Sequence, residues 1–366
     1  MPTTPPENRA KRRSLTRRVT TLFLLLLLFV LLRRGLLVAS LGLKILGYTT
    51  ALDAWQGPVR HQTVSHAGIP IDIYGEDSYS PILIVHGVNP TGKNSLDLMR
   101  VSEALAQVGY QVFVPDFIEM RRQHLQPEEA SQIKSAFQFI GKDAGIACFS
   151  YGCGPALIAA ADPEIRTHVR FALAFGGYFD IREALEFVVT GPESPVAYLK
   201  WVYLAANSDV IANEEDRERL RKIAEHYRLE NSLDAADAEG LSPEGKALLD
   251  IFTASKPEDF RARLNDGPEG LRLRLDALSP SRIVHQIHAP LILVHGINDP
   301  VIPAEQTVKL ADAARKNGLE CSLTLLRMYG HVHPVLPDFS VSSIFGFYLP
   351  ETVRFLRVVN RVIASK

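Results

Sequence analysis

Cysteine is scarce in this sequence: the 366 residues contain only Cys148, Cys153 and Cys321. Three cysteines are too few, and odd in number, for a disulfide framework. The chain also lacks an excess of either charge, since its formal net charge is −1, which excludes a strongly basic nucleic-acid-binding protein. With 46% hydrophobic and 22% charged residues, the composition is that of a globular protein. It excludes a disordered, collagen-like or wholly membrane-embedded chain.

The near-zero charge conceals an uneven distribution. Residues 1–48 carry nine basic side chains and one acidic side chain, a net +8, whereas the remaining 318 residues carry 31 basic and 40 acidic side chains, a net −9. Residues 1–18 form a basic tail without apolar periodicity, which predicts no fixed structure there. The uncharged run 19–32 follows, then Arg33 and Arg34, then a second apolar stretch to residue 48.

Three interpretations of residues 19–48 compete. A basic stretch before a short apolar run is typical of a secretory signal peptide, but two arginines stand where a small-residue cleavage site belongs. An uncleaved membrane anchor or signal anchor and a monotopic membrane-surface element are the other two, and we favour these two over a cleaved signal peptide. A helix buried in the protein core is less favoured, because this run has no polar face. The flanking positive charge keeps the N-terminus cytoplasmic and predicts a membrane-anchored protein whose catalytic body lies on the extracytoplasmic side.

The rest of the chain alternates strand-like and helix-like segments. The strands read as continuous apolar runs such as 82–85, 145–149 and 291–294, which predicts an α/β fold with a mostly parallel, doubly wound sheet covered on both faces. About 108 residues without a strand pattern interrupt it and read as helices. We therefore expect a core made of residues 52–177 and 286–366, with residues 178–285 inserted as a helical cap.

The most informative motif is Cys148-Phe-Ser150-Tyr-Gly152, which lies between an apolar strand and a helix of small residues. A nucleophile elbow needs small residues two positions before and after the serine, because the strand-to-helix turn is tight. Cys148 and Gly152 occupy these elbow positions. The motif predicts Ser150 as a nucleophile, whereas Cys148 reads as a packing residue.

A serine nucleophile needs a base, and the base needs an acid to orient it. Asp299 follows the apolar strand 291–294 in a turn, where it serves either as that acid or as an ordinary turn residue. The next strand ends in Gly330-His331-Val-His333. We favour His331 as the base over His333, from its position on the loop. A metal bound by this His-x-His pair is disfavoured, because no third ligand lies nearby.

An oxyanion hole requires two backbone N–H groups. Tyr151, which follows the nucleophile, predicts one of them, and Val88 in the loop after strand 82–85 predicts the other, with Asn89 next. The same loop, Gly87 to Asn94, also resembles a phosphate-binding P-loop around Lys93. Asparagine replaces the hydroxyl residue that such a loop uses for Mg²⁺.

Taken in order, the elbow at Ser150, the His86-Gly87 loop, Asp299, His331 and the helical insertion resemble the α/β-hydrolase superfamily over residues 59–366. The resemblance implies a serine hydrolase that cleaves an acyl ester or thioester through an acyl-enzyme, without a cofactor or metal. The expected partners are a small-molecule or lipid-like acyl substrate and the membrane, with no nucleic acid. The alternatives are a catalytically inactive membrane scaffold of the same fold and a P-loop-like nucleotide binder.

Overall fold

The computed structural model describes residues 35–37, 40–42, 44–45, 57–191, 196, 198–229, 238–335, 337–338 and 340–366. Its centre is an eight-stranded sheet in the order β1-β2-β4-β3-β5-β6-β7-β8. β2 pairs antiparallel with β1 and β4, and the remaining pairs are parallel. The strands are β1 (His61–His66), β2 (Ile69–Tyr74), β3 (Ser80–Val85), β4 (Tyr110–Pro115), β5 (Ala144–Phe149), β6 (Val169–Phe175), β7 (Leu291–Gly296) and β8 (Cys321–Leu326).

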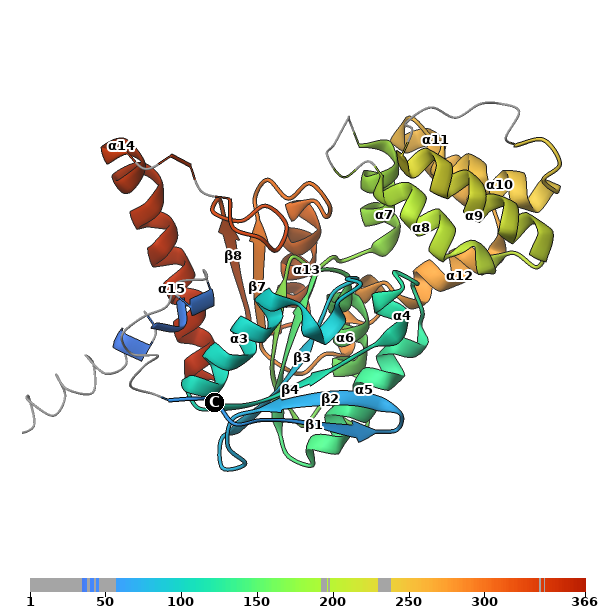
Figure 1. Cartoon of the computed structure of the whole chain (residues 1–366). Helices are drawn as coiled ribbons and strands as arrows, with labels where there is room; N and C mark the ends of the chain where they lie inside the picture. Colours follow the sequence, from blue (N-terminus) through green and yellow to red (C-terminus); the bar gives the residue numbers. More distant parts are fainter. Residues whose placement is uncertain are drawn as a thin grey trace, which may run out of the picture.

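Helices cover both faces of the sheet, which is why its central strands are apolar on both sides. In β3, Ile82 and Ile84 belong to the core under α3 and α15, whereas Leu83 and Val85 belong to the core on the opposite face. Figure 1 shows α3 and α15 on one side of the sheet and α5 and α6 on the other. These layers are α3 (Leu96–Gln107), α15 (Leu349–Ala364), α5 (Glu128–Ile140), α6 (Cys153–Ala161) and α13 (Ala304–Lys316), with the short α4 (Ile118–Arg121) beside them.

A group of helices between β6 and β7 lies to one side of the sheet, at the upper right of Figure 1. It corresponds to the helical insertion expected over 178–285. Its members are α7 (Ile181–Thr190), α8 (Leu199–Ala206), α9 (Glu214–Leu229), α10 (Pro243–Phe252), α11 (Pro257–Asp266) and α12 (Glu269–Ala277). Polar residues start two of these helices: Asp180 caps α7 and Ser242 caps α10 through backbone N–H groups, as expected at helix N-termini.

A polar latch, formed by His124, Asp209 and Arg274, joins the cap to the core. His124 follows α4, and its Nε2 lies 3.0 Å from Asp209 Oδ1. Both terminal nitrogens of Arg274 in α12 donate to Asp209, over 2.9 and 2.8 Å. Burial alone would raise the pKa of Asp209, but these hydrogen bonds hold it far below its usual range. The latch therefore contains an ionised carboxylate at neutral pH.

The C-terminal helix begins with a feature that the sequence did not indicate. A short turn of helix, α14 (Val341–Ser343), leads through a π-helical stretch (Ile344–Tyr348) into α15. Glu351 at the start of α15 is fully buried. Its carboxylate accepts hydrogen bonds from the backbone N–H groups of Arg327 and Met328, over 2.7 and 3.3 Å, which fixes this helix to the end of β8.

Most of the expected membrane segment 19–48 lies outside the described residues, as does the basic tail 1–18. The described part of its C-terminal half packs on the body instead: Ser40 and Leu41 are 4% and 2% exposed. A Cβ on Gly42 would lie 3.1 Å from Leu356 of α15, and Lys44 Nζ donates to Gln107 of α3 over 2.9 Å. The structure therefore does not support a membrane segment that includes residues 40–42, 44 and 45. Among the described residues, no helix combines the length and apolarity needed to cross a membrane.

Candidate active site

The elbow at Ser150 has the backbone geometry that its sequence predicts. β5 ends at Phe149, a single 3₁₀ turn (Ser150–Gly152) follows, and α6 begins at Cys153. Ser150 has φ = 53°, in the left-handed region that a residue with a side chain rarely adopts. A Cβ on Gly152 would overlap the backbone carbonyl oxygen of His86. Only glycine lets the start of α6 approach this neighbouring loop so closely.

Three side chains from different elements meet at this elbow. The Ser150 hydroxyl donates to His331 Nε2 over 2.6 Å, and His331 Nδ1 donates to Asp299 Oδ2, also over 2.6 Å. His331 follows β8 and Asp299 follows β7, so the carboxyl ends of three parallel strands supply the three groups. The arrangement holds the imidazole with its basic nitrogen toward the serine hydroxyl, as general-base activation requires.

Asp299 is held ionised by several donors. Its Oδ1 accepts from the backbone N–H groups of Val301 and Ile302, over 2.8 and 2.9 Å. His295 Nε2 lies 3.1 Å from its Oδ2. Burial alone would raise the pKa of Asp299, but hydrogen bonds with His295 and His331 outweigh it and lower the pKa to about 2. A carboxylate that stays charged at neutral pH can stabilise the imidazolium that forms on His331.

The two histidines of the His-x-His pair occupy different environments. His331 is part of the three-residue cluster, whereas the side chain of His333 is 72% exposed and its Nδ1 lies 3.1 Å from Asp97. The structure thus brings His331, and not His333, to Ser150. No group of three or more histidine, cysteine, aspartate or glutamate residues suited to a metal ion occurs in the part of the chain that the structure describes.

The loop after β3 lies directly against the serine. A Cβ on Gly87 would lie 3.0 Å from Ser150 Cβ and 3.1 Å from the carbonyl oxygen of Phe149. The buried ring of His86 orients this loop: its Nε2 accepts from the Phe117 backbone N–H over 3.1 Å. The proton is therefore on Nδ1, which donates to the Gly87 carbonyl over 2.8 Å. The Gly87 carbonyl and the Val88 N–H belong to the same peptide group, so this hydrogen bond also fixes the direction of the Val88 N–H.

Lys93, the central residue of the P-loop alternative, is engaged elsewhere. Its Nζ donates to Asp72 of β2 over 2.8 Å and to Asn94 over 3.2 Å. The Lys93 side chain is 12% exposed, so its ammonium group belongs to a largely buried ion pair with Asp72. It is not available in this arrangement to hold a phosphate.

Tyr151, the other expected oxyanion residue, has a buried side chain that connects the elbow to α5. Its hydroxyl donates to Glu129 Oε2 of α5 over 2.7 Å. Glu129 is 1% exposed, and its Oε1 has no hydrogen-bond partner among the described residues. Burial raises the pKa of Glu129 to about 8, although the bond from Tyr151 acts in the opposite direction. This carboxyl group is therefore largely protonated at neutral pH.

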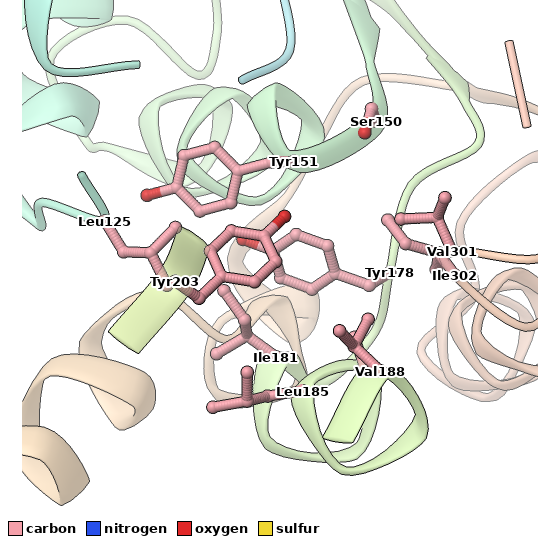
Figure 2. Close-up of a pocket in the computed structure, with 11 residues that line it drawn as sticks. Leu125, Ser150, Tyr151, Tyr178, Ile181, Leu185, Val188, Tyr203, Val301 and Ile302 are labelled. Atoms are coloured by element: carbon pink, nitrogen blue, oxygen red, sulfur yellow. The ribbon is translucent and has the colours of Figure 1, made fainter. Parts of the chain in front are cut away.

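Two hollows meet at Ser150. Figure 2 shows the smaller one, where Tyr151, Tyr178 and Tyr203 gather next to Ile181, Leu185 and Val188 of the cap. The other is a cavity of about 720 Å³ that is lined at Ser150 and His331 and also by α3, α15 and the sheet between them. Of the cap aromatics, Tyr203 lines both hollows, whereas Trp201 packs against Tyr227 inside the cap.

His295 and the larger cavity are not among the site features predicted from the sequence. His295 is fully buried at the end of β7, where its Nδ1 also lies 2.5 Å from Thr307 Oγ1. A histidine at the end of an apolar strand signals a buried polar group that needs partners, and Asp299 four residues later was a natural one. The cavity has no comparable signal, since its wall residues read as ordinary core.

The strand order, the elbow at Ser150 and the helical insertion after β6 together define the α/β-hydrolase fold that the motifs indicated. No family model and no curated protein matches the sequence. Among solved structures, an acylaminoacyl peptidase from Pyrococcus horikoshii is 13% identical, with a TM-score of 0.48, over 81% of this chain and 40% of that one. The present chain thus spans about two fifths of that peptidase.

Two other solved structures align with the present chain over nearly their whole length. The esterase RhEst1 from Rhodococcus is 15% identical over 84% of this chain and 98% of its own, with a TM-score of 0.44. A bacterial membrane phospholipase A is 17% identical over 94% and 99%, with a TM-score of 0.45. Likeness at this level carries no argument about activity or substrate, which must be argued from the site itself.

Proposed function

We propose that this protein is a serine hydrolase that cleaves an acyl ester or thioester. The observation that carries the proposal is the continuous hydrogen-bonded chain from Ser150 to His331 to Asp299, with both distances at 2.6 Å. Ser150 is the nucleophile, His331 the general base, and Asp299 the acid that orients it. The left-handed backbone of Ser150 supports this assignment, because strained conformations of this kind cluster at active sites.

In the acylation step, Ser150 Oγ attacks the acyl carbonyl carbon while its proton passes to His331 Nε2. The N–H groups of Val88 and Tyr151 hold the resulting oxyanion. The imidazolium then donates its proton to the leaving oxygen or sulfur as the carbonyl-carbon bond to it breaks, leaving an acyl-enzyme. Water, deprotonated by His331, attacks the acyl group, and Ser150 leaves with the returned proton as the acid is released.

Fluorophosphonate labelling tests this proposal on the full chain. The wild-type protein should be labelled at Ser150, and Ser150→Ala should not be labelled. Cys153→Ser is a matched control, because it changes a neighbouring buried side chain outside the proposed triad. A folded wild-type protein that resists labelling would favour the inactive scaffold, and loss of Mg-nucleotide binding in Lys93→Ala would favour the nucleotide-binding alternative.

A comparison of hydrolysis rates distinguishes an esterase or thioesterase from a peptidase. The substrates carry the same acyl group as an oxygen ester, a thioester or an amide. We expect hydrolysis of the oxygen ester and the thioester to exceed that of the matched amide. Faster cleavage of the amide would contradict the ester assignment while leaving the serine mechanism intact.

We further propose that the apolar run 19–32 attaches the protein to a membrane, with the body on the extracytoplasmic side. The support is the run's own composition and the +8 charge of residues 1–48. Fractionation of cells that express the full chain, followed by protease treatment of intact spheroplasts, tests both points. Recovery in the soluble fraction, or protection of the body from the protease, would contradict them.

A further inference from the structure

The larger cavity at Ser150 extends from the carboxyl ends of the strands toward their amino ends. At the carboxyl edge of the sheet it is lined by Ser150, His331 and Gly87, and it also contacts Ile82 of β3. Ile82 lies four residues before His86 along the strand, a rise of about 13 Å at the usual 3.3 Å per residue. A cavity confined to the cleavage site would not reach this level of the sheet.

The deep part of the cavity is walled by apolar side chains from every surrounding element. In α15, Phe355, Val358, Val359 and Val362 line it, and their spacing puts them on one face of the helix. The sheet, α3 and the N-terminal stretch complete the wall. One residue from each of several elements illustrates it: Leu41, Ile82, Val101, Ala147, Leu173 and Val358.

Polar side chains are confined to the other end. Those that line the cavity include Asn89, Asp97 and Arg100, which come from the loop after β3 and the first turns of α3. Asp97 pairs there with Arg100 and with His333. The cavity is therefore polar at the end that contains Ser150 and His331, and apolar along its depth.

A volume of about 720 Å³ lies within the range of ligand sites, about 300–1,000 Å³, and is far larger than the voids that a packed core tolerates. Since a water molecule takes about 30 Å³ of liquid, and a methylene group is of similar size, a chain of well over ten carbons fits. Apolar cavities do not hold ordered water well, because water needs several polar partners. A flexible hydrocarbon meets the demands of these walls.

We propose that this cavity is an acyl-chain site: the protein acts on long-chain acyl esters, with the chain lying between α3, α15 and the sheet while its carbonyl group meets Ser150. The proposal rests on the hydrolase function given above. It names the substrate class of that same site and assigns the acyl chain to the core side of Ser150.

The first experiment measures kcat/KM on p-nitrophenyl esters of 4, 8, 12 and 16 carbons, in mixed micelles of constant composition. Each methylene that enters the cavity should raise kcat/KM by at most about fourfold, the equivalent of ~0.8 kcal/mol. We expect the 16-carbon ester to exceed the butyrate ester by at least 100-fold. A profile that peaks at butyrate would overturn the proposal.

Three matched substitutions locate the chain. Val101→Trp and Val358→Trp fill the cavity from α3 and α15, and each should lower kcat/KM for the 16-carbon ester by at least tenfold while leaving the butyrate ester within twofold. Val353→Trp makes the same change on α15 at a site that is 41% exposed and does not line the cavity, so it should leave both values unchanged. Equal profiles for Val101→Trp, Val358→Trp and Val353→Trp would contradict the location.

Binding separates failure of this inference from failure of the proposed function. A fluorescent 18-carbon fatty acid should bind the full-length Ser150→Ala protein, and Val101→Trp added to it should weaken binding by at least tenfold. Fluorophosphonate labelling without chain binding would leave the serine hydrolase standing and overturn the acyl-chain site. Chain binding without labelling would support the cavity and count against hydrolysis.

Discussion

Replacing Glu129 by glutamine should stabilise the protein at alkaline pH and leave its stability nearly unchanged at pH 4. Glu129 is buried beneath the elbow, with one oxygen bonded to Tyr151 and the other without a partner among the described residues. Such a carboxyl group costs little when neutral and much when charged. Glutamine keeps the acceptor for the tyrosine hydroxyl and carries no charge at any pH.

The direction of this pH dependence follows from the number of protons that the folded and unfolded states bind. Burial raises the pKa of Glu129 in the folded protein to about 8, from 4.5 in the unfolded chain. Between these values the folded state holds a proton that the unfolded state has lost, so the free energy of unfolding falls as pH rises. A shift of this size corresponds to about 3–5 kcal/mol at 1.36 kcal/mol per pKa unit. The contribution is fully present below pH 4.5 and lost above pH 8.

Urea unfolding of the wild-type protein, Glu129→Gln and Glu128→Gln at pH 5, 7 and 9 measures this effect. Glu128 is the adjacent glutamate and is exposed, so its variant controls for the loss of one carboxylate from α5. The difference in unfolding free energy between Glu129→Gln and wild type should grow with pH, by about 3 kcal/mol or more. Curves that stay parallel across this range would refute a neutral buried carboxyl group at this position.

Three further predictions concern the elbow, the triad and the latch. Gly152→Ala should lower the free energy of unfolding by about 1–3 kcal/mol, because its methyl group would overlap the carbonyl of His86; a variant as stable as wild type in urea would contradict this. His295→Leu should lower kcat about 10- to 100-fold at constant KM, because Asp299 loses a donor that fixes its carboxylate; an unchanged kcat would show that His295 is dispensable. Asp209→Asn should lower the free energy of unfolding in urea at pH 7 by about 1–2 kcal/mol, because it removes the negative charge of the latch. This difference from wild type should shrink only well below pH 4, and a difference that shrinks near pH 6 would point to another group.

The sequence predicts the arrangement of the sheet and the geometry at Ser150 because both depend on local rules. Continuous apolar strands report burial on two faces, and the small residues at 148 and 152 report a tight turn. Asp299 and His331 were found because parallel strands bring their carboxyl ends to one edge. Choosing His331 over His333 depended on the loop position, and the structure places His331 at hydrogen-bond distance from Ser150.

The features that the sequence left unresolved depend on contacts between distant segments. The latch is one example, since Arg274 of α12 bonds to Asp209, which lies 65 positions earlier in the chain. The apolar stretch 35–48 has no polar face of its own, which is why the sequence favours a membrane segment there. Only the tertiary structure shows that Gly42 packs against α15 and that Lys44 bonds to α3.

The position of Leu41 and Ile45 in the cavity wall implies that a protein shortened at its N-terminus would have an incomplete cavity. Leu41 and Ile45 line the cavity, so a chain shortened to residues 52–366 would retain Ser150, Asp299 and His331 but lose part of the wall. We expect such a truncated protein to cleave short esters and to lose its selectivity for long ones. Residues that follow the apolar run 19–32 in the chain would then help to select the substrate.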